Sequence, residues 1–230
     1  MARRKPPTRL SEIARAACDV FIRAGYQRAQ MEDVALAAGV AKGTLYLYVE
    51  SKEAMFDLAL RFALGDAVDE LLPELPLRGP PSTRRFERIQ RELTKHGDFG
   101  LSSRPARNAR AHEVEAEARK VCELFFDRVQ DNRVGLKLVD RCARDLPELG
   151  ALWYEQRRDD AQRALAAWLR ARRSRLRPGL DPELTARFVL ETIAFWAMHR
   201  HWDPLPPPGN EAEIRSRVVS LLVGALVVES

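Results

Sequence analysis

A cation, a hydroxyl group and two phenols stand close together in a segment whose spacing predicts a short helix after a sharp turn. Lys42 carries the charge, Thr44 the hydroxyl, and Tyr46 and Tyr48 the phenols, and we expect these side chains to point outward. Ammonium, hydroxyl and phenol groups bind phosphate oxygens and the edges of bases in a groove. The segment therefore predicts a surface that binds double-stranded DNA.

A glycine and an apolar stripe must position these side chains. Gly39 stands where a first short helix must end, and its lack of a Cβ permits a positive φ at the turn. Apolar residues recur at helical spacing on both sides of this turn and predict one buried face for the two helices. They are Val34, Ala35 and Ala38 before the turn, and Val40, Leu45 and Val49 after it.

This segment and its flanks closely resemble the DNA-binding domain of the TetR family of bacterial transcriptional regulators. The resemblance includes the helices before and after the motif with their internal spacing, which makes it more specific than an isolated helix-turn-helix pattern. The matching stretches are Ala14–Ala17, Phe21, Gly25–Tyr26, Met31–Ala35, Ala38–Tyr46 and Tyr48–Phe56.

The resemblance implies that residues 42–48 form a recognition helix and that a homodimer binds a palindromic operator. It also implies release by a small-molecule effector, with repression as the commoner mode of the family. The positions that the family commonly uses on DNA are occupied by Lys42, Gly43, Thr44, Tyr46, Tyr48 and Lys52.

Side-chain chemistry divides these positions by role. Lys42 and Lys52 are expected to bind phosphates and make the affinity salt-sensitive. Thr44 and Tyr46 suit base edges or thymine methyl groups. Tyr48 is expected to donate a hydrogen bond to a phosphate.

Three departures from the family pattern affect the detail of these contacts. Gln30 and Met31 stand where a hydroxyl residue is frequent, so one phosphate contact is expected to be missing. Ala41 replaces a common serine, which removes a helix N-cap worth roughly 1 kcal/mol. Val49 replaces the usual phenylalanine and leaves a smaller core.

Charge is concentrated at the start of the chain. The 230 residues carry a formal net charge of +5, and residues 1–52 hold nine basic and five acidic residues, a surplus of four. This surplus lies where DNA contact is predicted, although a basic stretch taken alone can equally be a solvated face. The basic tail 1–8, with Arg3, Arg4 and Lys5, is interpreted either as an arm that orders in a minor groove or as a solvated tail.

The composition predicts a globular protein of the cytoplasm. Hydrophobic residues make up 46% and charged residues 31% of the chain. Cys18, Cys122 and Cys142 are odd in number and widely spaced, which indicates reduced thiols. We expect no signal peptide, and no apolar run approaches the roughly 18 residues that span a bilayer.

Helical periodicity predicts an all-α chain of two domains. The division is an N-terminal helix-turn-helix domain over residues 1–54 and a larger helical domain for effector binding and dimerisation over residues 55–230. Thr8, Ser51 and Asp181 are the expected N-caps, and the last is followed by a proline at the first helical position. The expected helices beyond the motif cover about 9–24, 51–72, 82–97, 105–142 with a break near Asn132 or Gly135, 148–173, 181–201 and 211–228.

Aromatic residues on the central helices allow two interpretations. At helical spacing such residues usually form a core, but they can also line an apolar effector cavity. The candidate pocket residues are Phe125, Phe126, Trp153, Tyr154, Trp168 and Trp196.

The last two predicted helices, 181–201 and 211–228, have the pattern of a dimer interface. Two such helices from each protomer make a four-helix bundle under two-fold symmetry. The alternative is that their apolar stripe packs on its own domain. That stripe comprises Ile214, Val218, Leu221, Leu222, Ala225 and Leu226, with Gly224 allowing close approach.

Two other classes of protein compete with a DNA-binding regulator. An enzyme is disfavoured because the chain has no glycine-rich phosphate loop, nucleophile elbow or HExxH motif, and we expect neither a cofactor nor a metal. His199 and His201 lie about 200° apart on a helix, so they cannot share a metal ion unless the helix end unwinds. The second competitor is a helical ligand-binding or interaction protein of the same fold that no longer reads DNA, which the missing hydroxyls at positions 30 and 41 permit.

Overall fold

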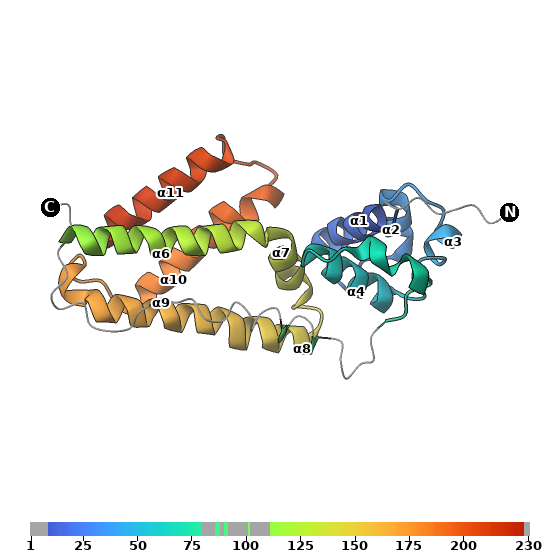
Figure 1. Ribbon diagram of the computed structural model, residues 1–230, viewed down its shortest axis with the longest axis horizontal. Coiled ribbons are helices and arrows are strands. Elements are labelled where there is room, and N and C mark those ends of the chain that lie inside the picture. The colour runs from blue at the N-terminus through green and yellow to red at the C-terminus, as the bar shows by residue number, and fades with distance from the viewer. Residues whose placement is uncertain (1–8, 80–85, 88–89, 92–100, 102–110, 228–230) are drawn as a thin grey trace. The chain divides into compact units, whose positions relative to one another are not determined.

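The computed structural model describes residues 9–79, 86–87, 90–91, 101 and 111–227, and helices dominate these residues (Figure 1). Backbone pairing of the β type is limited, in this described part, to an isolated bridge between Val49 and Leu77. The all-α prediction is confirmed. The expected N-cap Thr8, the basic tail and most of the helix expected at 82–97 lie outside the described residues.

The chain forms two compact units, of residues 1–92 with 134–153 and of residues 93–133 with 154–230. The sequence analysis places the domain boundary between residues 54 and 55. The first unit extends beyond that boundary and also includes residues 134–153, which are distant in sequence. The described helices of the first unit are α1 (Arg9–Ala24), α2 (Met31–Ala37), α3 (Lys42–Leu45), α4 (Lys52–Ala63), η1 (Val68–Glu74), α7 (Arg133–Cys142) and α8 (Pro147–Gly150).

The first unit is built around the apolar face of α1, which packs mainly against α4. Leu10, Ile13 and Phe21 on this face are almost completely buried. The Phe21 ring meets the Phe56 ring of α4 edge-on, with ring centroids 5.1 Å apart. Ser51 caps α4 as expected, since its hydroxyl accepts a hydrogen bond from the Ala54 amide at 3.2 Å.

The fourth helix is shorter than the sequence analysis predicts. It ends at Ala63 instead of continuing to about Leu72, and Gly65 follows with φ of +87°. A 3-10 helix, η1, then carries the chain through Pro73. A glycine with positive φ reverses the chain more cheaply than any other residue, which explains the early end.

The corner after α7 fixes the end of α1. The Arg141 guanidinium donates to the Ala24 carbonyl at 3.3 Å, and an Asp145 carboxylate oxygen accepts from the Gln27 amide at 3.1 Å. Gly25, between these contacts, has φ of +84°, and a Cβ placed on it would lie 2.6 Å from Asp145 Oδ2. These contacts explain why residues 134–153 belong to the first unit.

The second unit consists of helices that are far apart in sequence. Here α10 packs against both α6 and α9, and α11 packs on α6 (Figure 1). The break expected near Asn132 is confirmed, since α6 ends at Asp131 and the next helix begins at Arg133. The helices of this unit are α6 (Ala111–Asp131), α9 (Asp159–Arg172), η4 (Arg173–Arg175), α10 (Pro182–Ala197), η5 (His199–Trp202) and α11 (Glu211–Leu226), and the π-helix η3 (Ala151–Arg158) stands at the boundary between the units.

A charged network crosses the core of the second unit. Arg172 of α9 is buried and donates from Nε to a Glu117 carboxylate oxygen of α6 at 2.7 Å. The Trp168 indole donates to the same carboxylate at 3.2 Å. Burial opposes the charge on Glu117, but the hydrogen bonds from Arg172 and Trp168 outweigh it and lower the pKa of the carboxyl. The network therefore ties α6 to α9 at neutral pH and weakens as the pH falls through that lowered pKa.

Helix caps and thiols follow the sequence expectations. The Asp181 carboxylate accepts from the Leu184 amide at 2.8 Å, and Pro182 is the first residue of α10. Cys18, Cys122 and Cys142 are buried free thiols, and burial is the main cause that raises the pKa of each to about 12. All three thiols therefore stay protonated at neutral pH.

Replacing Gly25 by alanine should destabilise the protein by about 2 kcal/mol, because the new Cβ meets Asp145 and the positive φ strains any other residue. Urea unfolding followed by circular dichroism measures the change. Gly43→Ala is the matched control, since a Cβ there meets no atom within 4 Å and its stability should change little or rise. An unfolding midpoint of Gly25→Ala equal to that of the unmodified protein would contradict this account of the corner.

Candidate nucleic-acid interface

The turn between α2 and α3 has the geometry that the sequence predicts. Gly39 adopts φ of +63°, in the left-handed region that glycine enters without steric cost. The Val40 amide then donates to the Ala35 carbonyl at 2.9 Å, which closes the turn against the end of α2. Contacts between α2 and α3 complete a helix-turn-helix.

Both helices of the motif begin with weak caps. At α2 the Gln30 amide donates to an Asp33 carboxylate oxygen at 3.1 Å, which satisfies one backbone donor at the start of the helix. At α3 the N-cap is Ala41, which makes no side-chain cap hydrogen bond, as expected. The recognition segment therefore depends on packing more than on its own caps.

The segment expected as a helix over residues 42–48 is a four-residue helix followed by a turn. Residues Lys42–Leu45 are α-helical, and the Tyr48 amide then donates to the Leu45 carbonyl at 2.9 Å. Lys42 and Gly43 are exposed, Thr44 is half-buried, and the Tyr46 side chain is 40% exposed. These residues form a continuous surface segment, as the sequence analysis predicts for them.

Tyr48 does not point outward as expected; its side chain is only 4% exposed. It follows Leu45 by three residues, and that spacing brings it to the same face as the fully buried Leu45 and Val49. The Tyr48 carbonyl also accepts from the Leu77 amide at 2.8 Å, which holds this stretch to the chain beyond η1. The prediction of an exposed phenol at position 48 is therefore wrong.

Sequence reasoning overlooked Leu47, whose side chain is 57% exposed between the two tyrosines. Leu47 is not part of the apolar stripe of the motif. Its absence from that stripe could have indicated from the sequence that its side chain faces outward. An exposed leucine beside a lysine and a tyrosine can contact thymine methyl groups.

Lys42 is paired within the motif. Its ammonium bonds to the Glu32 carboxylate in the first turn of α2. The hydrogen bond between them is the main cause that lowers the pKa of Glu32 and raises the pKa of Lys42. Both side chains are more than half exposed, so the pair is weak and a phosphate can replace the carboxylate.

Lys52, at the start of α4, contacts the chain after α1. Its ammonium donates to the Gln27 carbonyl at 3.0 Å and lies 4.9 Å from the centroid of the Tyr26 ring. Two of its three donors are not used by that carbonyl, so the lysine can still bind a phosphate.

The six candidate pocket aromatics are placed in both units. Trp153 is buried in the first unit and donates from its indole to Asp140 at 3.2 Å. Phe125, Phe126 and Trp168 are buried in the core of the second unit, and Trp196 packs against this core. Tyr154 is half-buried. Phe125, Phe126 and Trp168 are therefore core residues, which is the first of the two interpretations offered by the sequence.

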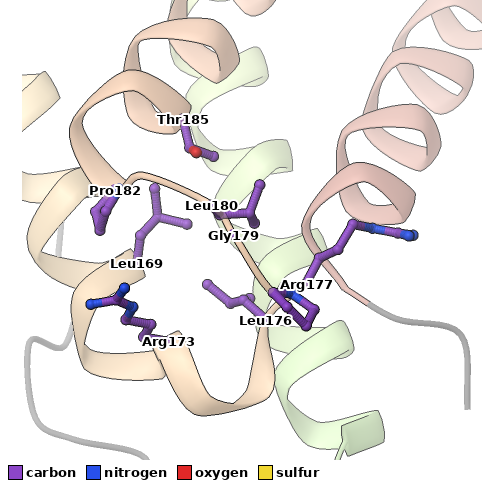
Figure 2. Close-up of a pocket in the computed structure, with 9 residues that line it drawn as sticks. Leu169, Arg173, Leu176, Arg177, Gly179, Leu180, Pro182 and Thr185 are labelled. Atoms are coloured by element: carbon purple, nitrogen blue, oxygen red, sulfur yellow. The ribbon is translucent and has the colours of Figure 1, made fainter.

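A hollow of about 250 Å³ lies in the second unit between the end of α9 and the start of α10 (Figure 2). We call it the α9–α10 hollow. Its lining residues all come from the stretch 169–185, so none of the six aromatics lines it.

The apolar stripe of the last helix is divided between the core and the surface. Ile214, Val218, Leu222 and Leu226 are buried against their own chain, as the alternative interpretation proposes. Leu221 and Ala225 remain exposed. On α10, Leu184 is 58% and Phe188 68% exposed, and Phe195 continues the same face.

The described residues contain neither a candidate membrane span nor a cluster of metal-ligating side chains. No described helix is long and apolar enough to cross a bilayer. No group of three or more histidine, cysteine, aspartate or glutamate side chains in the described part of the chain is arranged to hold a metal ion.

Comparison with known proteins agrees with the geometry of the first unit. The sequence model described as bacterial regulatory proteins of the tetR family matches residues 13–59. The fatty acid metabolism regulator protein of Bacillus subtilis (strain 168) is 27% identical over 96 residues, which are 40% of this chain and 47% of that protein. The match therefore spans about half the length of that curated relative.

Solved structures resemble the whole chain in fold. The ketosteroid transcriptional regulator KstR2 of Mycobacterium tuberculosis superposes with a TM-score of 0.56 at 18% identity, over 98% of each chain. SCO3833, a TetR-family member from Streptomyces coelicolor A3, superposes with a TM-score of 0.55 at 24% identity, over 93% of this chain and 90% of that one. At these identities the likeness concerns the fold.

The matched domain and its exposed recognition segment define a DNA-binding transcriptional regulator of the helix-turn-helix class. Over residues 13–59 the chain is similar to the bacterial regulatory proteins of the tetR family.

Proposed function

We propose that the chain is a homodimeric regulator that binds a palindromic operator and leaves it when a small-molecule effector binds. The observation that carries this proposal is the exposure of Lys42, Gly43 and Tyr46 on a helix-turn-helix inside the family match. A site of this kind acts where the chromosome lies, so we propose that the protein works in the cytoplasm.

The proposed contacts follow from exposure and side-chain type. Lys42 exchanges Glu32 for a phosphate, and Lys52 binds a second phosphate. Thr44 and Tyr46 contact base edges, and Leu47 adds an apolar contact to a thymine methyl. The buried Tyr48 supports the segment from beneath instead of donating to a phosphate.

A dimer is required because a four-residue helix reads only a few base pairs. Two such helices placed one turn of DNA apart read both halves of a palindrome. We propose that α10 and α11 form the interface, since Leu184, Phe188 and Leu221 leave an apolar surface exposed there. Apolar side chains of this size gain free energy when a second copy covers them.

Selection from a random duplex pool tests the function directly. The full-length protein should enrich a palindrome whose half-sites are about 10 base pairs apart, as two recognition helices require. A protein of the same fold that no longer reads DNA would enrich no sequence, and that outcome would refute operator binding. The position of the enriched site relative to promoters then distinguishes repression from activation.

Replacing Tyr46 by alanine should weaken binding to the selected operator by about 1–3 kcal/mol while leaving the fold intact. The side chain is exposed and supports no core, so the loss should come from contacts with bases. Fluorescence anisotropy with labelled duplex measures the affinity, and a thermal melt checks the fold.

Tyr48→Phe serves as the matched control for the Tyr46 variant. It removes one hydroxyl from a buried ring, and we expect operator affinity to stay unchanged. Unchanged affinity of Tyr46→Ala would remove this residue from the reading surface. A loss of operator affinity in Tyr48→Phe would instead support a hydrogen bond from the Tyr48 hydroxyl to a phosphate, which the burial of this side chain argues against.

The proposed interface predicts the effect of a charge at position 188. Sedimentation at micromolar concentration should show twice the 26.1 kDa chain mass, and Phe188→Glu should weaken the dimer at least tenfold. Leu205→Glu is the control, because Leu205 is 85% exposed in the loop between α10 and α11 and should not affect assembly. A single 26.1 kDa species in the unmodified protein, or equal effects of both variants, would contradict this interface.

A further inference from the structure

The α9–α10 hollow combines an apolar floor with a cationic rim. Leu169, Leu176 and Leu180 contribute the apolar surface together with two prolines, and Thr185 adds one hydroxyl. A volume of about 250 Å³ is slightly below the roughly 300 Å³ at which ligand pockets usually begin, so the hollow suits a small molecule.

The charged residues that line the hollow are both arginines, Arg173 and Arg177, and no acidic side chain lines it. Arg177 is engaged elsewhere: its guanidinium donates to the Gly224 carbonyl at 2.8 Å and to the Val227 carbonyl at 3.3 Å. Figure 2 shows its side chain directed away from the hollow toward α11, where these carbonyls lie.

Arg173 differs from Arg170 and Arg172, the basic residues just before it. Arg170 pairs with Glu183, and Arg172 is buried on Glu117, but the Arg173 guanidinium makes no hydrogen bond or ion pair within the described residues. In Figure 2 it lies beside Leu169 and Pro182 at the side of the hollow.

Nearby acidic groups already have partners. Glu183 is held by Arg170, and the Asp181 carboxylate caps α10 through the Leu184 amide. Neither of these carboxylates lines the hollow, and each is already bonded to a group of its own chain.

We propose that the α9–α10 hollow binds a small amphipathic anion, with its apolar chain on the leucine floor and its anionic head on Arg173. A guanidinium forms strong, charge-assisted hydrogen bonds with carboxylate or phosphate oxygens, and the apolar chain gains from leaving water. If this ligand is the effector of the proposed regulator, the effector is a small amphipathic anion. This identification rests on the proposed function, whereas binding of the anion to the hollow does not.

Isothermal titration of the full-length protein with octanoate, octyl phosphate and octan-1-ol tests the site. We expect saturable binding of one or both anions, at least tenfold tighter than the neutral alcohol, and the tighter anion identifies the preferred head group. Arg173→Gln should weaken anion binding at least tenfold and leave octan-1-ol unchanged.

Arg175→Gln is the matched control. Arg175 lies two residues further along η4, is exposed and does not line the hollow, so its replacement should leave octanoate and octyl phosphate affinities unchanged. Equal losses in both variants would indicate general charge attraction and overturn the proposal, as would the absence of saturable binding by either anion. The titration contains no DNA, so a failure of operator selection leaves its result interpretable on its own.

Discussion

The burial of Leu45, Tyr48 and Val49 beneath α3 is the constraint on which the DNA-binding surface depends. A helix of four residues has no stability of its own, because nucleation costs more than one turn of hydrogen bonds returns. Its N-cap is an alanine without a capping side chain, so local chemistry adds little. Packing from beneath and the backbone pairing with Leu77 therefore fix the direction in which Lys42, Tyr46 and Leu47 face.

Two lysines, Lys42 and Lys52, place positive charge on the same surface. Lys42 and Glu32 form an exposed pair that satisfies the lysine in the free protein without immobilising it strongly. Lys52 is held nearer its own chain by the Gln27 carbonyl and the Tyr26 ring. Lys42 is thus held only by an exposed ion pair, whereas the position of Lys52 is set by two contacts with its own chain.

In the second unit, ion pairs beside the apolar core join helices that are distant in sequence. Arg172, Glu117 and Trp168 connect α6 with α9 across 55 residues of sequence, and Arg215 of α11 bonds to Asp127 of α6 at 2.5 Å. Removing the Glu117 carboxylate would leave the buried Arg172 guanidinium without its partner, which costs more free energy than the pair contributes to stability. These contacts give the helices a defined register, and they leave the apolar faces of α10 and α11 exposed.

The sequence by itself determined the all-α class, the helix-turn-helix, its positive-φ glycine and the caps at Ser51 and Asp181, because each depends on residues a few positions apart. Local spacing also predicted Lys42, Gly43 and Tyr46 at the surface. Only the tertiary structure decided that Tyr48 is buried, that α4 ends early, and that residues 141–145 hold the end of α1. It also decided that the open hollow lies among leucines and arginines away from the candidate aromatics. Each of these outcomes depends on contacts between segments distant in sequence, whose partners no local pattern identifies.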